Sequence, residues 1–381
     1  MFALLATAMA ANFDIVSDDS VARAALGNCP SVEPRLMDRV DRDPDDLAAR
    51  LALDGCRVGG AALESALADL ASLYQVGAPF DPGLLLKRRD TQPGDREKLV
   101  REVQVAAGFL VRSLVEQRRW SDAQLALYEM EKRVGSSAPL AAARVAVERG
   151  QNGAASAWTH ATTALYTYPE DADVLEQVAL VIFDDGARAP ADAIDAVLVR
   201  GRPSAKLNGL LGLARSGRAR DCLARVDSVR VPDEYADRLR AVSYRCAVNG
   251  RDLDRANAIV AKGSAGLDAR VMAEHAEIWL LQGANEAAYN LVEAIVMDDS
   301  KAAEVALRAL QAMGRDAEMT ALAAKLPSTS VARLAAAVAL FNARRYDAAL
   351  TLLPSDCAVY SSTNVQLCES ARVGSMRALS R

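Results

Sequence analysis

Apolar residues recur at helical spacing along most of the chain. Two stretches that show the pattern are Leu307, Leu310 and Met313, and Val331, Leu334, Val338 and Phe341. Residues three or four positions apart lie on one face of an α-helix, so each stretch predicts a helix with a single buried face. Every long segment has this character, and the chain is therefore predicted to be all-α.

Turn-like glycine positions recur at a nearly constant interval. They are Gly150, Gly186, Gly217, Gly250, Gly283 and Gly314, with spacings of 36, 31, 33, 33 and 31 residues. Such a period holds two helices of about 12 to 14 residues and two turns, which is the unit of a helical solenoid. We expect each glycine to end a helix in the left-handed conformation. Ser121 and Gln124 have the spacing of a capping box that would begin a second helix.

The N-terminal region differs in amino-acid composition from the repeats. Residues 12 to 57 are acidic and interrupted by prolines, which predicts short helices at Ser20–Leu26, Pro34–Asp41 and Asp45–Leu53, followed by Ala61–Gln75. The expected regions are a possible signal-peptide remnant at 1–11, an N-terminal helical cap at 12–76, a linker at 77–95, helical repeats at 96–353 and a C-terminal capping helix at 354–381.

The C-terminal region is expected to cover the last repeat. A helix at Asn364–Leu379 would pack over the helix at Tyr346–Leu353, because a terminal repeat must shield its apolar face from water. Val365, Leu367 and Val373 are the residues expected to make this contact.

Composition and charge exclude several classes of protein. Hydrophobic residues are 51% of the chain, enough to bury a core, whereas aromatic residues are only 5%, which favours closely packed helices over β-structure. Lys+Arg 45 against Asp+Glu 50 gives a net charge of −5, the wrong sign for a protein that neutralises phosphates. We expect no nucleic-acid partner. No segment approaches the ~18 to 20 apolar residues of a membrane span.

The N-terminus and the cysteines favour an oxidising compartment. Residues 1–11, MFALLATAMAA, resemble the end of a signal peptide, with an apolar first helix as the alternative. Six cysteines fall into local pairs, predicting disulfides Cys29–Cys56, Cys222–Cys246 and Cys357–Cys368, with buried free thiols as the alternative. A periplasmic or secreted protein is therefore expected, and a cytoplasmic one is the alternative.

The residues that carry chemistry are few. His160 and His275 lie in different repeats, and the sequence contains no nucleophile elbow, phosphate-binding loop or zinc motif. Two acidic clusters, Asp41, Asp43, Asp45 and Asp46, and Asp298 with Asp299, lack the spacing of a calcium loop. They are interpreted as helix caps and solvated turns. We expect no enzyme activity, no cofactor and no metal site.

Residues 96 to 353 resemble tetratricopeptide repeats (TPR). In the segment from Gly283 to Ala288, a glycine closes the first helix and a small residue follows five positions later, as in that family. Trp120 with Ala123, Leu253 with Ala256, and Tyr346 with Ala349 show the family's apolar residue three positions before the small one. Two departures are that Gly250 lies six positions before Ala256 and that Cys222 and Met319 occupy the small position. The resemblance implies a right-handed α-solenoid of antiparallel helix pairs.

The function expected for such an array is that of a non-catalytic scaffold, and the signal-like start and paired cysteines favour the bacterial cell envelope as its location. Such an array would bind a protein or peptide partner along the concave surface that the first helices form. The residues expected there are Arg238, Tyr244, Arg245, Arg270, Glu274, Arg308 and Gln311. The alternative is an enzyme or enzyme accessory whose site lies among the acids of residues 12 to 60. The sequence does not predict the oligomeric state.

Overall fold

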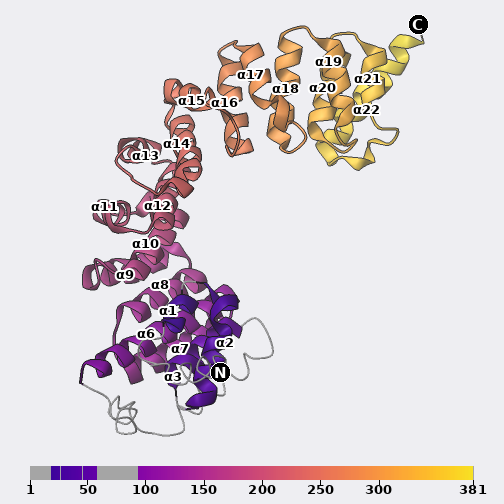
Figure 1. The fold of residues 1–381 in the computed structure, drawn as a ribbon. Helices are drawn as coiled ribbons and strands as arrows, with labels where there is room; N and C mark the ends of the chain where they lie inside the picture. Colours follow the sequence, from indigo (N-terminus) through magenta and orange to yellow (C-terminus); the bar gives the residue numbers. More distant parts are fainter. Residues whose placement is uncertain (1–18, 26, 45, 58–92, 381) are drawn as a thin grey trace, which may run out of the picture. The chain divides into compact units, whose positions relative to one another are not determined.

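The computed structural model describes residues 19–25, 27–44, 46–57 and 93–380. These residues form α-helices and short 3-10 helices joined by turns, with no strand among them (Figure 1). The apolar segment 1–11, the helix expected at Ala61–Gln75 and most of the linker expected at 77–95 lie outside the described residues. The all-α prediction is confirmed.

The chain divides into two compact units, Met1–Pro232 and Asp233–Arg381. The first unit contains α1 (Ser20–Ala25), α2 (Cys29–Arg42), α3 (Leu47–Arg57), α6 (Pro93–Glu116), α7 (Trp120–Val134), α8 (Ala138–Asn152), α9 (Ala154–Thr167), α10 (Ala172–Asp185), η2 (Gly186–Arg188), α11 (Ala191–Arg200), α12 (Pro203–Arg215) and α13 (Ala219–Val226). The region boundaries expected at 76, 95 and 353 stay predictions.

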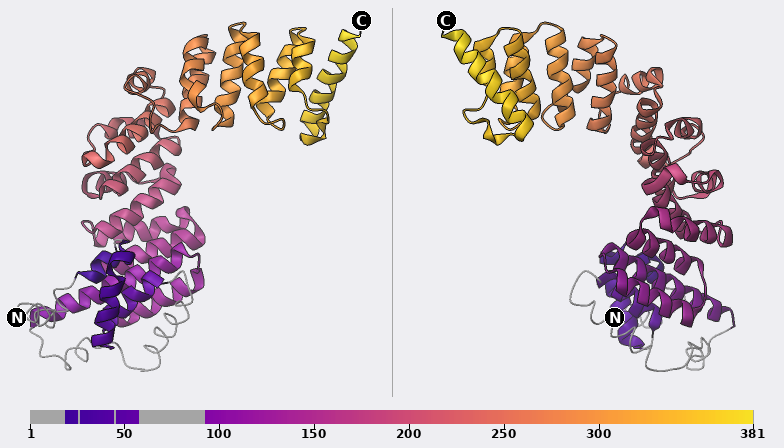
Figure 2. Two further views of the ribbon diagram at one scale, coloured as in Figure 1. Left: turned by 45° about the vertical axis from the view of Figure 1, so that its right-hand side comes forward. Right: turned by 180° about the vertical axis from the view of Figure 1, so that it is seen from behind.

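The second unit continues the same alternation of helices. It contains η3 (Asp233–Tyr235), α14 (Ala236–Gly250), α15 (Leu253–Val260), α16 (Ala269–Leu281), α17 (Asn285–Val292), η4 (Glu293–Ile295), α18 (Ser300–Ala312), α19 (Asp316–Lys325), α20 (Val331–Asn342), α21 (Tyr346–Leu352), η5 (Cys357–Val359) and α22 (Ser362–Leu379). Within each unit, neighbouring helices lie side by side in sequence order (Figures 1 and 2).

Each unit has two layers of helices. In the first unit, α6, α8, α10 and α12 pack on one another in succession, and α7, α9, α11 and α13 each pack on the preceding helix of that series. In the second unit, α14, α16, α18, α20 and α22 form the corresponding layer of first helices, and α15, α17, α19 and α21 are the second helices. This is the paired-helix, TPR-like architecture that the sequence predicted.

A left-handed residue recurs in the turns within the helix pairs. Such residues are Arg118, Gly217, Arg251, Gly283, Gly314 and Arg344, with φ between 58° and 81°. Five positions after each comes a buried residue of the second helix, namely Ala123, Cys222, Ala256, Ala288, Met319 and Ala349. The glycine prediction is thus right at Gly217, Gly283 and Gly314, whereas arginine takes the same conformation in three other turns.

Three of the glycines expected in turns have other roles. Gly150 lies inside α8, where a Cβ atom would come 2.2 Å from the Trp120 ring, so it serves close packing. Gly186 is right-handed, with φ −61°. Gly250 is the last residue of α14, and the left-handed residue is Arg251, which restores the five-residue spacing to Ala256.

Four of the second helices, α7, α13, α19 and α21, have an arginine at the N-cap position rather than a capping box. The N-cap of α7 is Arg119, and its Nε donates to Asp122 at 2.6 Å. Equivalent bonds join Arg218 to Asp221 and Arg315 to Glu318, both at 2.7 Å. The capping box expected from Ser121 and Gln124 is wrong, because Ser121 already lies in the first turn of α7, which begins at Trp120.

The N-terminal helices pack on α6 through a buried ionic cluster. Arg39 of α2 is 1% exposed and binds Asp46 through two nitrogens, at 3.1 and 3.3 Å. A third nitrogen donates to Glu102 of α6 at 2.6 Å. Burial alone would lower the pKa of Arg39, but hydrogen bonds and Coulomb attraction from Glu102 and Asp46 outweigh burial and raise it. The cluster therefore joins α2, the start of α3 and α6.

The start of the second helix in this region was predicted too late. α2 begins at Cys29 rather than at Pro34. Pro30 is accommodated in the first turn, where its missing N–H has no helical partner, and Pro34 lies inside the helix.

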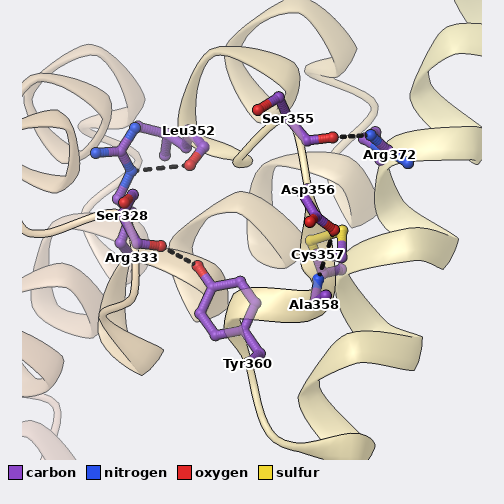
Figure 3. The surroundings of a disulfide bond; sticks show 10 residues. Ser328, Arg333, Leu352, Ser355, Asp356, Cys357, Ala358, Tyr360 and Arg372 are labelled. Atoms are coloured by element: carbon purple, nitrogen blue, oxygen red, sulfur yellow. Dashed lines mark hydrogen bonds between the residues drawn. A yellow bond between two sulfur atoms is a disulfide. The ribbon is translucent and has the colours of Figure 1, made fainter.

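The disulfides have the neighbour pattern expected from the sequence. Cys29 pairs with Cys56, joining α2 to α3 with Cα atoms 5.5 Å apart. Cys357 of η5 pairs with Cys368 of α22, with Cα atoms 5.8 Å apart (Figure 3). Cys222 and Cys246 are also disulfide-bonded, and the described residues include no free cysteine. Because the other four cysteines are paired with one another, Cys222 and Cys246 are bonded to each other, as predicted.

The C-terminal helix packs as expected, but through other residues. α22 contacts α21 and α20. The residues that it buries are Cys368, Ala371 and Ser375. Leu367 and Val373, expected to make the contact, are 48% and 38% exposed, so that part of the prediction is wrong. Small residues face the neighbouring helices because only they permit a close approach.

Candidate functional site

A groove of about 830 Å³ lies on the first helices of the second unit. Its floor is formed by Ala303 and Leu307 of α18 and by Ala332 and Ala336 of α20. Three of these four side chains are single methyl groups. They fill little of the space between the helices, so the groove is deep at these positions. The segments leading into α18 and α20 form one end of the groove, and the start of α16 borders it.

Two exposed apolar side chains stand at the entrance to this groove. Met297, in the segment before α18, is 60% exposed, and Val331, the first residue of α20, is 59% exposed. Large apolar side chains with this much contact with water gain free energy when a partner covers them. The groove therefore offers an apolar contact surface above a floor of small residues.

The charged side chains at the groove compensate one another. Glu277 of α16 accepts from Lys301 at 2.8 Å and from Arg308 at 3.2 Å. Glu304 lies 3.7 Å from Lys301 and 3.5 Å from Arg308. The hydrogen bond from Lys301 is the main reason that the pKa of Glu277 is lowered, although burial acts in the opposite sense. Because cations and carboxylates are paired, no excess charge of either sign dominates the groove.

The groove brings together three of the residues selected from the sequence. Arg270, Arg308 and Gln311 line it. Glu274 is not in the lining but lies 3.6 Å from Arg270, one helical turn away.

Two more of the selected residues lie elsewhere on the same layer of helices. Arg245 binds Asp268 at 2.7 Å. Arg238 is exposed, with its guanidinium carbon 5.8 Å from the ring centre of Tyr235. Neither residue lines the groove, and their role in partner binding stays a prediction.

Tyr244 is not on a surface at all. Its side chain is fully buried, and its hydroxyl lies 3.0 Å from Nδ1 of His275 on the neighbouring first helix α16. A buried tyrosine cannot contact a partner, so its selection as a binding residue is corrected. Its hydroxyl group instead joins α14 to α16 inside the second unit.

His275 is buried together with Tyr244. Its ring packs against that of Trp279 at a tilt of 50°, with centroids 4.4 Å apart, and its Nε2 has no hydrogen-bond partner among the described residues. Burial lowers the pKa of His275 from 6.5 to about 4, so the imidazole is uncharged at neutral pH. The other histidine, His160, is partly exposed on α9 in the first unit.

Met297, Val331, Lys301 and Glu277 were not selected from the sequence. A signal for the first two was present, because each is a large apolar residue at the entry to a first helix, where polar capping residues are usual. Met297 stands two positions before Asp299, whose carboxylate accepts from the backbone N–H groups of Lys301 and Ala302. An apolar residue at such a solvent-facing entry is therefore a signal in the sequence for a candidate contact surface.

A second groove, of about 1000 Å³, lies in the first unit between α1, α6, α8, α10 and α12. Four carboxylates line it, Glu97, Glu170, Asp171 and Asp173, together with Arg101 and Arg202. Asp171 caps α10, and Asp173 binds Arg202 at 2.9 Å. The lining is thus acidic on balance, in contrast to the groove of the second unit.

The acidic clusters have structural partners. Asp46 is bound by Arg39 and also accepts from the backbone N–H of Ala49. Asp299 caps α18. Among the residues that the structure describes, no three His, Cys, Asp or Glu side chains are grouped closely enough to hold a metal ion. In the same part of the chain, no helix combines the length and apolarity needed to cross a membrane.

Comparisons with known proteins add little to this picture. No protein-family model matches the sequence, and no curated protein matches it. Among solved structures, the chain is similar to the crystal structure of yeast Tom70, with 13% sequence identity over 96% of this chain and 89% of that chain and a TM-score of 0.30. A likeness this low carries no information on a ligand or a function. The TPR-like description rests on the helix pairs and turns themselves.

Proposed function

We propose that this chain is a non-catalytic scaffold that binds an apolar segment of a protein partner in the groove of the second unit. The observation that carries the proposal is the pair of exposed side chains, Met297 and Val331, above the alanine-lined floor. Protein binding is a common use of solenoid surfaces, which present side chains from successive repeats.

The groove fits an apolar side chain better than a charged group. The floor alanines leave room for a partner's side chain, and fully burying one aliphatic side chain contributes about 1.5–3 kcal/mol. Lys301 and Arg308 already bind Glu277, so a partner's carboxylate would have to compete with an existing ion pair. Apolar contact therefore supplies the affinity, and the paired charges at the edge supply specificity.

We further propose that the protein works in an oxidising compartment such as the periplasm. The disulfides support this, because such bonds form and persist in oxidising compartments and are rare in the cytosol. The signal-like segment 1–11 supports it independently. Alkylation of thiols in intact cells, followed by mass spectrometry, tests the compartment. Recovery of Cys29 and Cys56 in the alkylated form would contradict it.

The binding proposal is tested with a random peptide library displayed on phage. The full chain should enrich peptides that contain aliphatic or aromatic residues. The double variant Met297→Asp and Val331→Asp should weaken binding of the enriched peptides at least about tenfold, because two charges would then have to be buried.

The matched control is Leu281→Asp, which changes a side chain of the same unit that is 75% exposed and does not line the groove. This variant should bind the enriched peptides as the wild type does. Equal binding by the groove variant and the wild type would contradict the proposal, as would an equal loss in both variants.

A further inference from the structure

The methionines of the described residues differ widely in their contact with water. Three are exposed, Met297 by 60%, Met376 by 47% and Met37 by 43%. Three others are at most 3% exposed, namely Met130, Met272 and Met319. A peroxide oxidises a methionine sulfur that it can reach, so Met297 is the first target by exposure. All six cysteines are disulfide-bonded, so no thiol of this chain competes for the oxidant.

Met297 differs from the other two exposed methionines in its position. It lies between η4 and α18 and lines the groove of the second unit. Met376 lies on α22 and Met37 on α2, and neither lines that groove. The most exposed methionine is therefore also part of the apolar surface that the proposed function assigns to a partner.

We propose that oxidation of Met297 to its sulfoxide releases the partner from this groove. The inference rests on the proposed function and adds a form of regulation to it. In the reaction, a lone pair of the Met297 sulfur attacks one oxygen of hydrogen peroxide, and the O–O bond breaks. The products are the sulfoxide and one molecule of water, because the leaving hydroxide takes up the proton of the transferred oxygen. The sulfur loses two electrons, and the peroxide gains them.

The sulfoxide weakens binding because it brings a polar oxygen into an apolar contact. Its oxygen is a hydrogen-bond acceptor that water solvates in the free protein and that a bound partner would cover. The floor alanines and Leu307 have no side-chain donor to replace that water. Lys301 and Arg308 already donate to Glu277. Covering the oxygen without a donor therefore costs free energy, and the partner binds about tenfold more weakly.

The change at Met297 is chemically reversible. Methionine sulfoxide reductases return the sulfoxide to the thioether, and its oxygen leaves as water while two thiols of the reductant form a disulfide. The described residues include no free cysteine, so they cannot supply the two electrons themselves. The groove would thus report the balance between a peroxide and an external thiol reductant.

Peptide binding by the full chain before and after hydrogen peroxide treatment tests the proposal. The probes are enriched phage peptides that contain no Met, Cys or Trp, and the peroxide is removed before they are added. Once peptide mass spectrometry shows that Met297 is oxidised, the dissociation constant of the wild type should be raised about tenfold. Treatment with methionine sulfoxide reductases should restore the original constant.

Three variants separate oxidation of Met297 from oxidation elsewhere. Met297→Leu keeps an apolar side chain without sulfur, so it should bind as the wild type does and keep that affinity after peroxide treatment. Met376→Leu, the matched control on α22, should lose affinity on treatment as the wild type does. Met297→Gln places a polar side chain at the same position and should bind about tenfold more weakly without any oxidant. Thermal melting should show that all the variants are folded.

Three results would overturn the proposal. They are unchanged binding by wild type that is oxidised at Met297, an equal loss on treatment in Met297→Leu, and a Met297 that resists peroxide while Met376 is oxidised. The proposed function fails by a different result, namely enriched peptides that M297D/V331D binds as well as the wild type does. Binding that is lost in M297D/V331D but kept after oxidation overturns only the release by oxidation.

Discussion

The two units share a frame of helix pairs but join their helices by different chemistry. In the first unit, a buried guanidinium, Arg39, binds carboxylates of two other segments, Asp46 and Glu102. In the second unit, two first helices are joined by an uncharged pair, Tyr244 and His275. Removing any one partner of the ionic cluster leaves a buried charge unpaired and lowers the stability of the fold. The neutral pair lowers the stability of the fold when one of its members becomes charged. The same architecture thus has two different points of weakness.

The largest effect is expected at Arg39. Arg39→Ala should lower the free energy of unfolding by about 3–5 kcal/mol, because Asp46 and Glu102 would remain buried without their cation. Urea unfolding followed by circular dichroism measures the change. Arg42→Ala is the matched control, since Arg42 lies on the same helix in an exposed ion pair with Asp38 and should cost at most about 1 kcal/mol. Equal losses in the two variants would show that the buried cluster contributes no more to the free energy of unfolding than an exposed ion pair does.

Acidification should affect the second unit through His275. Above pH 6.5 the imidazole is neutral in both the folded and the unfolded chain, so the full stability is present there. As the pH falls from 6.5 towards 4, the unfolded chain takes up a proton that the folded chain does not, and the free energy of unfolding decreases. The loss should reach at most about 3 kcal/mol and stay constant at lower pH.

Urea unfolding at several pH values, compared between wild type and variants, isolates this contribution. The double variant Tyr244→Phe and His275→Leu removes both polar groups, and its stability should depend less on pH between 6.5 and 4. His160→Gln, a change at the partly exposed histidine of the first unit, should follow the wild type. A double variant that keeps the full pH dependence would show that carboxylates elsewhere cause it.

The smallest effect is expected in the turns. Arg251→Gly should raise stability by up to about 1 kcal/mol, because glycine adopts a positive φ without steric cost. Gly283→Ala, at the equivalent position of the next repeat, should lower it by a similar amount. Thermal melting of both variants measures the difference. The same sign in both would show that factors other than backbone strain decide the residue at this position.

The local features of the fold could be predicted from the sequence because they depend on near neighbours. Helical periodicity, the repeat length and the pairing of Cys29 with Cys56 all involve short separations. The ionic cluster could not be predicted, because Arg39 and Glu102 are 63 residues apart. The turn positions were only partly predictable. Glycine is the residue expected in the left-handed conformation, but here Arg251 adopts it rather than the adjacent Gly250.

The candidate site was predicted at the level of the helix but not of the side chain. Arg270, Arg308 and Gln311 were found because residues on the first helices share a layer. Tyr244 was misplaced because the sequence gives its helix but not the face that α16 covers. Met297 and Val331 were missed because they lie at helix entries, outside the periodic pattern that identified the other residues.

The nearest-neighbour disulfides have a consequence for the order of oxidation. Cys29 and Cys56 have no cysteine between them, and neither do Cys357 and Cys368. A chain that is oxidised from its N-terminus as it emerges meets the native partner of Cys29 before any competing thiol. Oxidative refolding of the full chain without an isomerase should also give both loops, as peptide mapping would show, because each native bond closes a short loop, of 27 and 11 residues.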